Sequence, residues 1–492
     1  MPLVIQTFRS SKTPWDIFQS VYADSQTCFF LDSPNASQSQ RNGDGGNPDH
    51  RRFKKNKSQN TPRYQSPDPV YSYIGMDPVL EIRLEGQDLR IRGVINERHA
   101  ASELFPVLRR IFAKYRIPSR KRRPFFTGGF VGYFGYEAAD LCDKIKFRGK
   151  PGPDVPRIYW GLFQEVIVYD HQKSLYALIV NSAQRATINA QREKLKKYFE
   201  TPIRRKETFR LKKISPEMTK DQFKTMVTKA QEYIAAGDIY QANLSQRFSF
   251  DYQGSSLALY EKLRAINPSP FSCFLKTGDL EIVSSSPERL IRKKGRICET
   301  RPIAGTCPTR GSAKRLALWR KKLLQNEKEK AEHLMLVDLE RNDLGRVCDY
   351  RSVKVEEFMT LEKYSHVVHL VSKITGKLKK GNEALEVVKA MFPGGTITGC
   401  PKIRCMEIID ELEPVRRGIY TGSLGYIDLH GDMDLNIVIR TILLQNGKGH
   451  LQVGAGIVYD SDPEKEYEET LHKAKALVTA LVFASTGRNH AL

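Results

Sequence analysis

Four glutamates on two charged segments of the chain have the spacing of a metal site. Glu329 and Glu332 lie three residues apart in EKAEHLML, and Glu466 and Glu469 have the same spacing in EKEYEETL. We expect both segments, residues 326–345 and 462–483, to be helices, and because residues three apart share one face of a helix, each offers a pair of carboxylates. Carboxylates without histidine or cysteine ligands favour Mg²⁺. The alternative is the ordinary salt-bridge pattern of a solvent-facing helix.

Other residues could bind an anionic substrate. Arg440 falls inside the apolar run LNIVIRTILL (435–444), which predicts a strand, and a guanidinium there needs an anionic partner such as a substrate carboxylate. His369 falls in a second predicted strand. The segments FPGGTITG (392–399) and VGAGIV (453–458) predict glycine-rich turns whose backbone amides could hold an anion. A structural ion pair, a core histidine and plain tight turns are the alternatives.

Composition indicates a large folded enzyme. The chain has 492 residues, of which 40% are hydrophobic, and amphipathic helical segments alternate irregularly with strand-like runs. Without a dinucleotide fingerprint or a P-loop, this pattern predicts an α+β fold. No apolar run reaches the roughly 18 residues of a membrane span. The first residues lack the pattern of a secretory signal, so we expect a cytoplasmic protein.

The formal net charge of +23 raises the question of nucleic-acid binding. Basic runs at 50–57, 119–123, 204–206 and 314–322 could form a phosphate-binding surface. These runs are dispersed and lack interleaved aromatic residues. A solvated basic surface is therefore the favoured interpretation, and nucleic acid is not an expected partner.

A longer set of motifs resembles the chorismate-utilising enzymes, which include anthranilate synthase component I, aminodeoxychorismate synthase component I and the isochorismate and salicylate synthases. The resemblance runs from about residue 214 to 483, through GDIYQANLSQR, SSSPERL, RPIAGT, AEHLMLVDLERNDLGRV, YSHVVHLVS, PGGTITGCPKIRCMEIIDELEP and GAGIVYDSDPEKEYEET. A weaker likeness extends into the first half through FFLDS, YIGMDP and GGFVGYFGYE.

The resemblance implies large antiparallel β-sheets packed as a sandwich with helices outside. A charged linker near residue 205 divides the chain into an N-terminal anthranilate-synthase-like region (1–205) and a chorismate-binding catalytic domain (206–492). The polar stretch at about 34–68 is nearly free of large aliphatic residues and predicts a disordered insert.

Carried over position by position, the resemblance also implies a site. Glu288 would be the acid or base near the C4 hydroxyl of chorismate, with His369 assisting proton transfer. Glu332 and Glu469 would bind Mg²⁺, supported by Glu329 and Glu466. The residues implied to bind or surround the substrate are Gly305, Thr306, Tyr420, Arg440, Gly454, Ala455, Gly456 and Lys473, and Thr306 is also counted with the catalytic group.

Gln241 favours amination over the addition of water. Water-using relatives resemble one another in placing a lysine base at this position, and a neutral amide cannot activate water in that way. The sequence contains no G-x-C-x-G glutaminase loop with a His-x-Glu partner. The resemblance therefore implies that a separate glutamine amidotransferase subunit supplies the ammonia.

The choice between two aminating reactions depends on which residues occupy a few motif positions. FPGGTITG and RRGIYTGSLGYI resemble the aminodeoxychorismate synthases, which serve p-aminobenzoate and folate synthesis. Ala304 resembles anthranilate synthase, because some aminodeoxychorismate synthases have a nucleophilic lysine there. We expect 4-amino-4-deoxychorismate as the product, with anthranilate and pyruvate as the alternative. The segments FFLDS (29–33) and NPSPFSCFL (267–275) could hold tryptophan.

Overall fold

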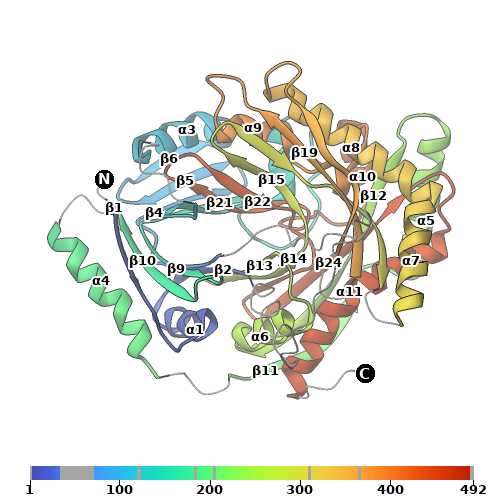
Figure 1. Cartoon of the computed structure of the whole chain (residues 1–492). Coiled ribbons are helices and arrows are strands. Elements are labelled where there is room, and N and C mark those ends of the chain that lie inside the picture. Colours follow the sequence, from blue (N-terminus) through green and yellow to red (C-terminus); the bar gives the residue numbers. More distant parts are fainter. Residues whose placement is uncertain are drawn as a thin grey trace, which may run out of the picture.

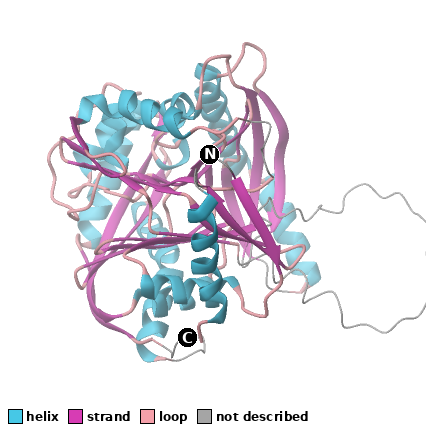
Figure 2. Cartoon of the chain, turned by 90° about the vertical axis from the view of Figure 1, so that its left-hand side faces the viewer, coloured by secondary structure: helices cyan, strands magenta, loops and turns pink. Residues whose placement is uncertain are grey.

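Two large antiparallel sheets stack face to face, and helices cover their outer faces (Figures 1 and 2). The computed structural model describes residues 3–33, 71–118, 124–181, 185–202, 207–308, 312–363 and 367–487. The predicted disordered insert and three of the four basic runs lie outside the described residues. The prediction of an α+β fold built on large antiparallel sheets is confirmed.

Strands from both halves of the chain contribute to both sheets. The first sheet has the spatial order β1 (Leu3–Phe8), β10 (Leu175–Asn181), β9 (Glu165–Asp170), β3 (Tyr71–Met76), β2 (Thr27–Asp32), β13 (Phe271–Thr277), β14 (Leu280–Ser286), β23 (Thr441–Gln445), β24 (Lys448–Ile457), β12 (Gln241–Gly254) and β11 (Phe209–Pro216), with β20 (Gly399–Cys400) beside β12. The second has the order β17 (Ile303–Pro308), β19 (Val367–Lys377), β16 (Ile297–Thr300), β15 (Arg289–Lys294), β22 (Met433–Asn436), β21 (Ser423–Asp428), β7 (Gly129–Phe134), β8 (Ile158–Phe163), β4 (Leu80–Glu85), β5 (Asp88–Gly93) and β6 (Glu97–Ala100), with β18 (Lys354–Lys363) beside β19. The halves meet where β2 pairs with β13 and where β7 pairs with β21.

Alternating side chains explain the stacking of the sheets. On β7, Phe130 and Phe134 pack on the helix-covered outer side of the second sheet. Val131 and Tyr133, which alternate with them, join a core that also contains Phe29 of the first sheet. Because successive side chains of a strand point to opposite faces, a strand that is apolar throughout can serve two cores.

Helices enclose the sandwich on both sides. Helices α3 (Leu104–Tyr115) and α9 (Ala384–Met391) cover the second sheet, whereas α1 (Pro14–Asp24), α4 (Arg185–Glu200), α6 (Ser256–Ile266) and α11 (Pro463–Thr486) cover the first. Helices α5 (Lys220–Ala235), α7 (Ala313–Gln325), α8 (Glu327–Val347) and α10 (Lys402–Leu412) gather on the right in Figure 1. Within the described parts of the chain, no helix is long and apolar enough to cross a membrane.

Helix α11, which carries Glu466 and Glu469, has strong local start and stop signals. The Asp462 side chain accepts two backbone N–H groups of the first turn, at 2.9 and 3.2 Å. Pro463 fits the first helical position, where its missing N–H costs nothing. Gly487 ends the helix with a left-handed φ of 67°. The predicted helix, and with it the shared face of the two glutamates, is confirmed.

Two segments of the chain cross between the sheets side by side. One leads from β14 in the first sheet to β15 in the second, and the other from β22 in the second sheet to β23 in the first. The backbone N–H of Ile437 donates to the carbonyl oxygen of Glu288 at 3.0 Å. The backbone N–H of Ser285 donates to the carbonyl oxygen of Arg440 at 3.1 Å. These bonds hold Glu288 and Arg440 on neighbouring segments.

Candidate active site

Glu288 is an almost completely buried carboxyl group on the crossing from β14 to β15. Its exposed fraction is 7%. Burial raises the pKa of Glu288 to about 7, against the opposing effects of the Thr396 hydroxyl and of the charges of Lys473 and Arg440. A carboxyl group with this pKa is about half protonated at neutral pH, so it can donate a proton as a general acid.

The predicted strand position of Arg440 is wrong. Strand β22 ends before Arg440 and β23 begins after it, so the residue lies in the second crossing, with a left-handed φ of 50°. In sequence, the segment 435–444 resembles a single buried strand, because Ile437 and Val438 of the crossing are apolar and buried. Burial is the main cause of the shifted pKa values of Glu288 and His369, and the charge of Arg440 acts on both. The guanidinium therefore lies near both groups.

His369 on β19 has a defined tautomer. Its Nδ1 atom lies 3.1 Å from the carbonyl oxygen of Gly305. Because a carbonyl oxygen only accepts, Nδ1 carries the hydrogen and Nε2 is the basic nitrogen of the ring. Burial, together with the charge of Arg440, lowers the pKa of His369 to about 4. The ring is therefore neutral at pH 7, and Nε2 can accept a proton.

Gly305 makes this contact possible through a bulge in β17. The pairing of β17 with β19 shifts register between Ala304 and Thr306, and Gly305 has a left-handed φ of 56°. A Cβ atom at Gly305 would lie 2.7 Å from Cδ1 of Leu323 and 3.0 Å from Oε2 of Glu329. The backbone thus approaches Leu323 of α7 and Glu329 of α8 as closely as a residue without a side chain allows. The Thr306 side chain is outside what the structure describes.

The segment VGAGIV is part of a strand and not the predicted turn. Gly454, Ala455 and Gly456 lie in β24 and pair with β12. A Cβ atom on Gly454 would lie 2.6 Å from Oδ1 of Asn243 and 2.8 Å from the hydroxyl oxygen of Tyr420. Glycines in a strand often mark a close approach by other groups. Here they leave room for polar side chains on the face of the sheet.

Gln241 and Glu332 meet at the next glycine of the same strand. A Cβ atom on Gly456 would lie 2.6 Å from Nε2 of Gln241 and 3.8 Å from Oε1 of Glu332. Gln241, the first residue of β12, is 4% exposed. The structure therefore brings a residue predicted to select the nucleophile next to a predicted metal ligand.

Lys473 connects helix α11 to the same strand. Its Nζ atom donates to the carbonyl oxygen of Gly454 at 3.0 Å and lies 2.6 Å from Oε1 of Glu469. Its charge also opposes the effect of burial on the pKa of Glu288. The salt-bridge pattern expected of a charged helix is present at Lys473 and Glu469, and the same lysine reaches the site.

The predicted metal ligands come from helices α8 and α11. Glu466 accepts a hydrogen bond from the Ser461 hydroxyl at 2.7 Å. Within the described ranges, no three His, Cys, Asp or Glu side chains cluster closely enough to hold a metal ion. Mg²⁺ usually takes one or two carboxylates together with substrate oxygens and water. The carboxylates are ligands of the type that Mg²⁺ takes, but in the described residues no three of the predicted ligands come together, so an ion here would need oxygens from substrate or water as well.

Three polar residues of this region were missed from sequence. The Thr396 hydroxyl lies beside Glu288. Glu340 on α8 is 3% exposed, and its pKa is raised to about 8, mainly by burial and then by the charge of Asp343, with a smaller contribution from Glu288. Asn243 faces Gly454. A signal existed for Asn243, because it follows Gln241 by two residues in a predicted strand and so shares its face.

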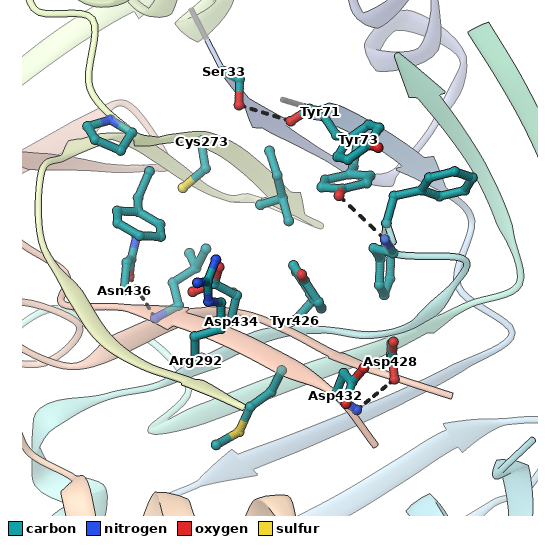
Figure 3. Close-up of a pocket in the computed structure, with 18 of the residues that line it drawn as sticks. Ser33, Tyr71, Tyr73, Cys273, Arg292, Tyr426, Asp428, Asp432, Asp434 and Asn436 are labelled. Carbon is teal, nitrogen blue, oxygen red and sulfur yellow. Dashed lines mark hydrogen bonds between the residues drawn. The ribbon is translucent and has the colours of Figure 1, made fainter. Parts of the chain in front are cut away.

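A separate cavity of about 300 Å³ lies between the sheets (Figure 3). The two segments predicted to hold tryptophan both line it, FFLDS through Leu31, Asp32 and Ser33 and NPSPFSCFL through Pro270, Phe271, Ser272 and Cys273. Aromatic side chains that line it are Tyr71, Tyr73, Phe125, Phe126, Phe271 and Tyr426. None of the residues predicted for catalysis, substrate binding or metal binding lines this cavity.

Comparisons with known proteins agree with the motifs. A family model described as "chorismate binding enzyme" matches residues 59–479. Aminodeoxychorismate synthase component 1 of Bacillus subtilis is 41% identical over 424 residues, which cover 84% of this chain and 89% of that protein. Anthranilate synthase component 1 of Aquifex aeolicus is also 41% identical, over 432 residues, which cover 84% of this chain and 86% of that protein. The crystal structure of anthranilate synthase component I from Streptococcus pneumoniae matches with a TM-score of 0.74 and 34% identity, covering 86% of this chain and 95% of that one.

Proposed function

The chain belongs to the chorismate-binding enzyme family, and from this premise we propose that it catalyses the Mg²⁺-dependent amination of chorismate to 4-amino-4-deoxychorismate. In this reaction ammonia replaces the C4 hydroxyl, one water leaves, and the enolpyruvyl group is retained. The observation that carries the proposal is Glu288, a buried acid with a pKa of about 7 close to Arg440 and Lys473.

Glu288 and His369 divide the proton transfers. Hydroxide is a poor leaving group, so the proton of Glu288 passes to the C4 oxygen as the C–O bond breaks, and water departs. The lone pair of ammonia forms the C–N bond, which leaves the nitrogen with one surplus proton. The neutral His369 ring can accept that proton at Nε2, because its Nδ1 hydrogen is directed at Gly305.

Positive charge near Glu288 suits the substrate, which carries two carboxylates. Arg440 and Lys473 both act electrostatically on Glu288, so a dianion bound beside that acid meets two cations. We assign Tyr420 and the strand residues Gly454, Ala455 and Gly456 to the same substrate site. Gly305 and Thr306 are assigned to the wall around the ring.

Carboxylates of α8 and α11 would hold Mg²⁺. Glu332 and Glu469 are the proposed ligands, with Glu329 and Glu466 as supporting carboxylates. When bound, the ion would neutralise and orient a substrate carboxylate. The position of Glu332 beside Gly456, on the strand whose Gly454 contacts Lys473, supports this assignment.

Ammonia is the proposed nucleophile, and a separate subunit is its proposed source. Gln241 is a buried neutral amide, so no base is available there to activate water. Unprotonated ammonia needs no such base. The relatives are named as components, which supports a partner protein, and we propose that this partner is a glutamine amidotransferase.

Anthranilate synthase activity is the second candidate. Ala304, which is 9% exposed on β17, has no nucleophile that could form a covalent adduct with the ring. This residue favours direct amination at C2 with loss of pyruvate. It also means that a C4 amination by this chain requires a route without an enzyme-bound lysine adduct.

The cavity between the sheets is the proposed tryptophan site. Its aromatic lining suits a bicyclic ring, and both segments predicted from sequence contribute to it. In this assignment, residues of both regions, 1–205 and 206–492, form the effector site, whereas the residues proposed for catalysis all lie within 206–492.

Product analysis tests the proposal. The protein is incubated with chorismate, Mg²⁺ and ammonium at alkaline pH, and products are identified by mass spectrometry. Aminodeoxychorismate, converted to p-aminobenzoate by an added lyase, is the expected product. Fluorescent anthranilate would establish the second candidate instead. No aminated product, with ammonium or with the amidotransferase partner and glutamine, would overturn both.

A further inference from the structure

Two amide side chains lie next to each other on one face of strand β12. Gln241 and Asn243 are two residues apart, so their side chains point to the same side of the sheet. Strand β24 pairs with β12, and its Gly454 and Gly456 lie on the same face as the two amides. Cβ atoms on these glycines would lie 2.6 Å from Oδ1 of Asn243 and 2.6 Å from Nε2 of Gln241. The amides occupy space that only glycine leaves open.

The carbonyl oxygens of both amides are buried acceptors without a donor. Neither Oε1 of Gln241 nor Oδ1 of Asn243 has a hydrogen-bond partner within the described part of the chain. Buried polar atoms in folded proteins are nearly always paired, and an unpaired acceptor is costly. Two such atoms on adjacent side chains, on the face that adjoins Tyr420 and Glu332, suit a ligand that donates at least two hydrogen bonds.

The position of the pair is inside the proposed active site. The hydroxyl oxygen of Tyr420 would lie 2.8 Å from a Cβ atom on Gly454, and Oε1 of Glu332 would lie 3.8 Å from one on Gly456. Both are residues assigned to substrate or metal binding. A small ligand held by the two amides would therefore adjoin the substrate.

The chemistry of the pair distinguishes between the two substrates. Chorismate, with two ionised carboxylates and one hydroxyl, offers a single hydrogen-bond donor. Ammonia has three N–H donors and one lone pair. Two carbonyl acceptors can fix two of its N–H groups and leave the lone pair available for attack.

We infer that the side-chain carbonyls of Gln241 and Asn243 form the ammonia-binding site of this enzyme. The inference rests on the proposed amination and extends it by a residue, Asn243, with a defined role. Because neither amide is a base, water held at the same place would not be deprotonated, whereas ammonia is already nucleophilic. The glycines of β24 are required because they accommodate the amides.

Steady-state kinetics with ammonium as the varied substrate test this inference. In Asn243→Leu and Gln241→Met, which keep size and remove the acceptor, the KM for free ammonia should rise about tenfold or more. The KM for chorismate should stay within about twofold, because the dianion binds elsewhere in the site. Asn243→Ser, a smaller change that also withdraws the carbonyl, should show the same selective rise and covers the case in which the leucine variant fails to fold.

Gln246→Met is the matched control. Gln246 is a fully buried amide on the opposite face of the same strand, where its Nε2 donates to the Thr470 hydroxyl at 2.6 Å. Its Oε1, like the acceptors of the pair, has no partner within the described residues, but it lies outside the proposed site. This variant should leave the KM for ammonia unchanged.

An active wild-type enzyme whose Asn243 variants keep the ammonia KM, or lose chorismate affinity instead, would overturn the inference alone. A wild-type enzyme that forms no aminated product would overturn the proposed function together with it.

Discussion

Nδ1 of His369 lies 3.1 Å from the carbonyl oxygen of Gly305, a residue 64 positions earlier in the chain. The contact connects two neighbouring strands across a bulge, and it fixes which ring nitrogen carries the hydrogen. A local backbone feature, the left-handed φ of Gly305, thereby determines the proton chemistry available to a histidine of the candidate site.

Gly305→Ala should impair both folding and turnover. The left-handed backbone costs a non-glycine residue about 1–2 kcal/mol, and the new Cβ atom would also crowd Leu323 and Glu329. Gly86→Ala is the matched control, since Gly86 has a φ of 57° and no atom within 4 Å of the added Cβ. Urea unfolding should show a larger loss of unfolding free energy for Gly305→Ala, and only this variant should lower kcat. Equal effects of the two substitutions on stability and turnover would contradict the close packing at Gly305.

Glu288 should make stability depend on pH in a particular direction. Its folded pKa of about 7 is higher than the usual value of 4.5, so the folded state binds the extra proton. This contribution is present below about pH 4.5 and is lost as pH rises through about 7, for a total near 3 kcal/mol. Between pH 5 and pH 8, wild type should therefore lose more unfolding free energy than Glu288→Gln. Parallel stability curves for the two proteins would contradict the burial of an ionisable group there.

Removing one proposed metal ligand should abolish turnover without unfolding the protein. Glu332→Gln and Glu469→Gln each delete a carboxylate charge while keeping side-chain size, so Mg²⁺-dependent activity should fall by at least about a hundredfold. Glu464→Gln on the same helix as Glu469 is the control, because Glu464 pairs with Lys220 and Lys224 at the surface. Activity should be followed over a range of Mg²⁺ concentrations, with circular dichroism to monitor folding. Full activity in either ligand variant would show that the metal assignment is wrong.

Loss of the Arg440 charge should raise the pKa values of both Glu288 and His369. Burial is the main cause of both pKa shifts, and Arg440 in addition lowers the pKa of Glu288 and of His369. In Arg440→Met both pKa values should therefore rise, which moves both limbs of the pH profile of kcat/KM to higher pH. Chorismate affinity should fall as well. Arg440→Lys keeps the charge, so its pH limbs should stay near those of wild type, and a shift of equal size in both variants would exclude an electrostatic cause.

Local sequence patterns were sufficient for the elements that carry the candidate site. The two charged segments that carry Glu329 and Glu332 and Glu466 and Glu469 were predicted to be helices, and both helices are present. His369 was predicted to lie in a strand, and it does. These predictions succeeded because the side-chain periods of helices and strands are properties of the backbone itself, and neighbouring residues suffice to reveal them.

Tertiary structure decided the environment of the remaining residues. An apolar run does not record which sheet its residues join, so the change of sheet that places Arg440 beside Glu288 could not be read from LNIVIRTILL. Glycines suit both turns and close approaches, and only the pairing of β24 with β12 distinguished the two for VGAGIV. Whether the acceptors of Gln241 and Asn243 find a donor depends on every segment packed around them, because hydrogen bonding in a protein interior is satisfied across the whole fold.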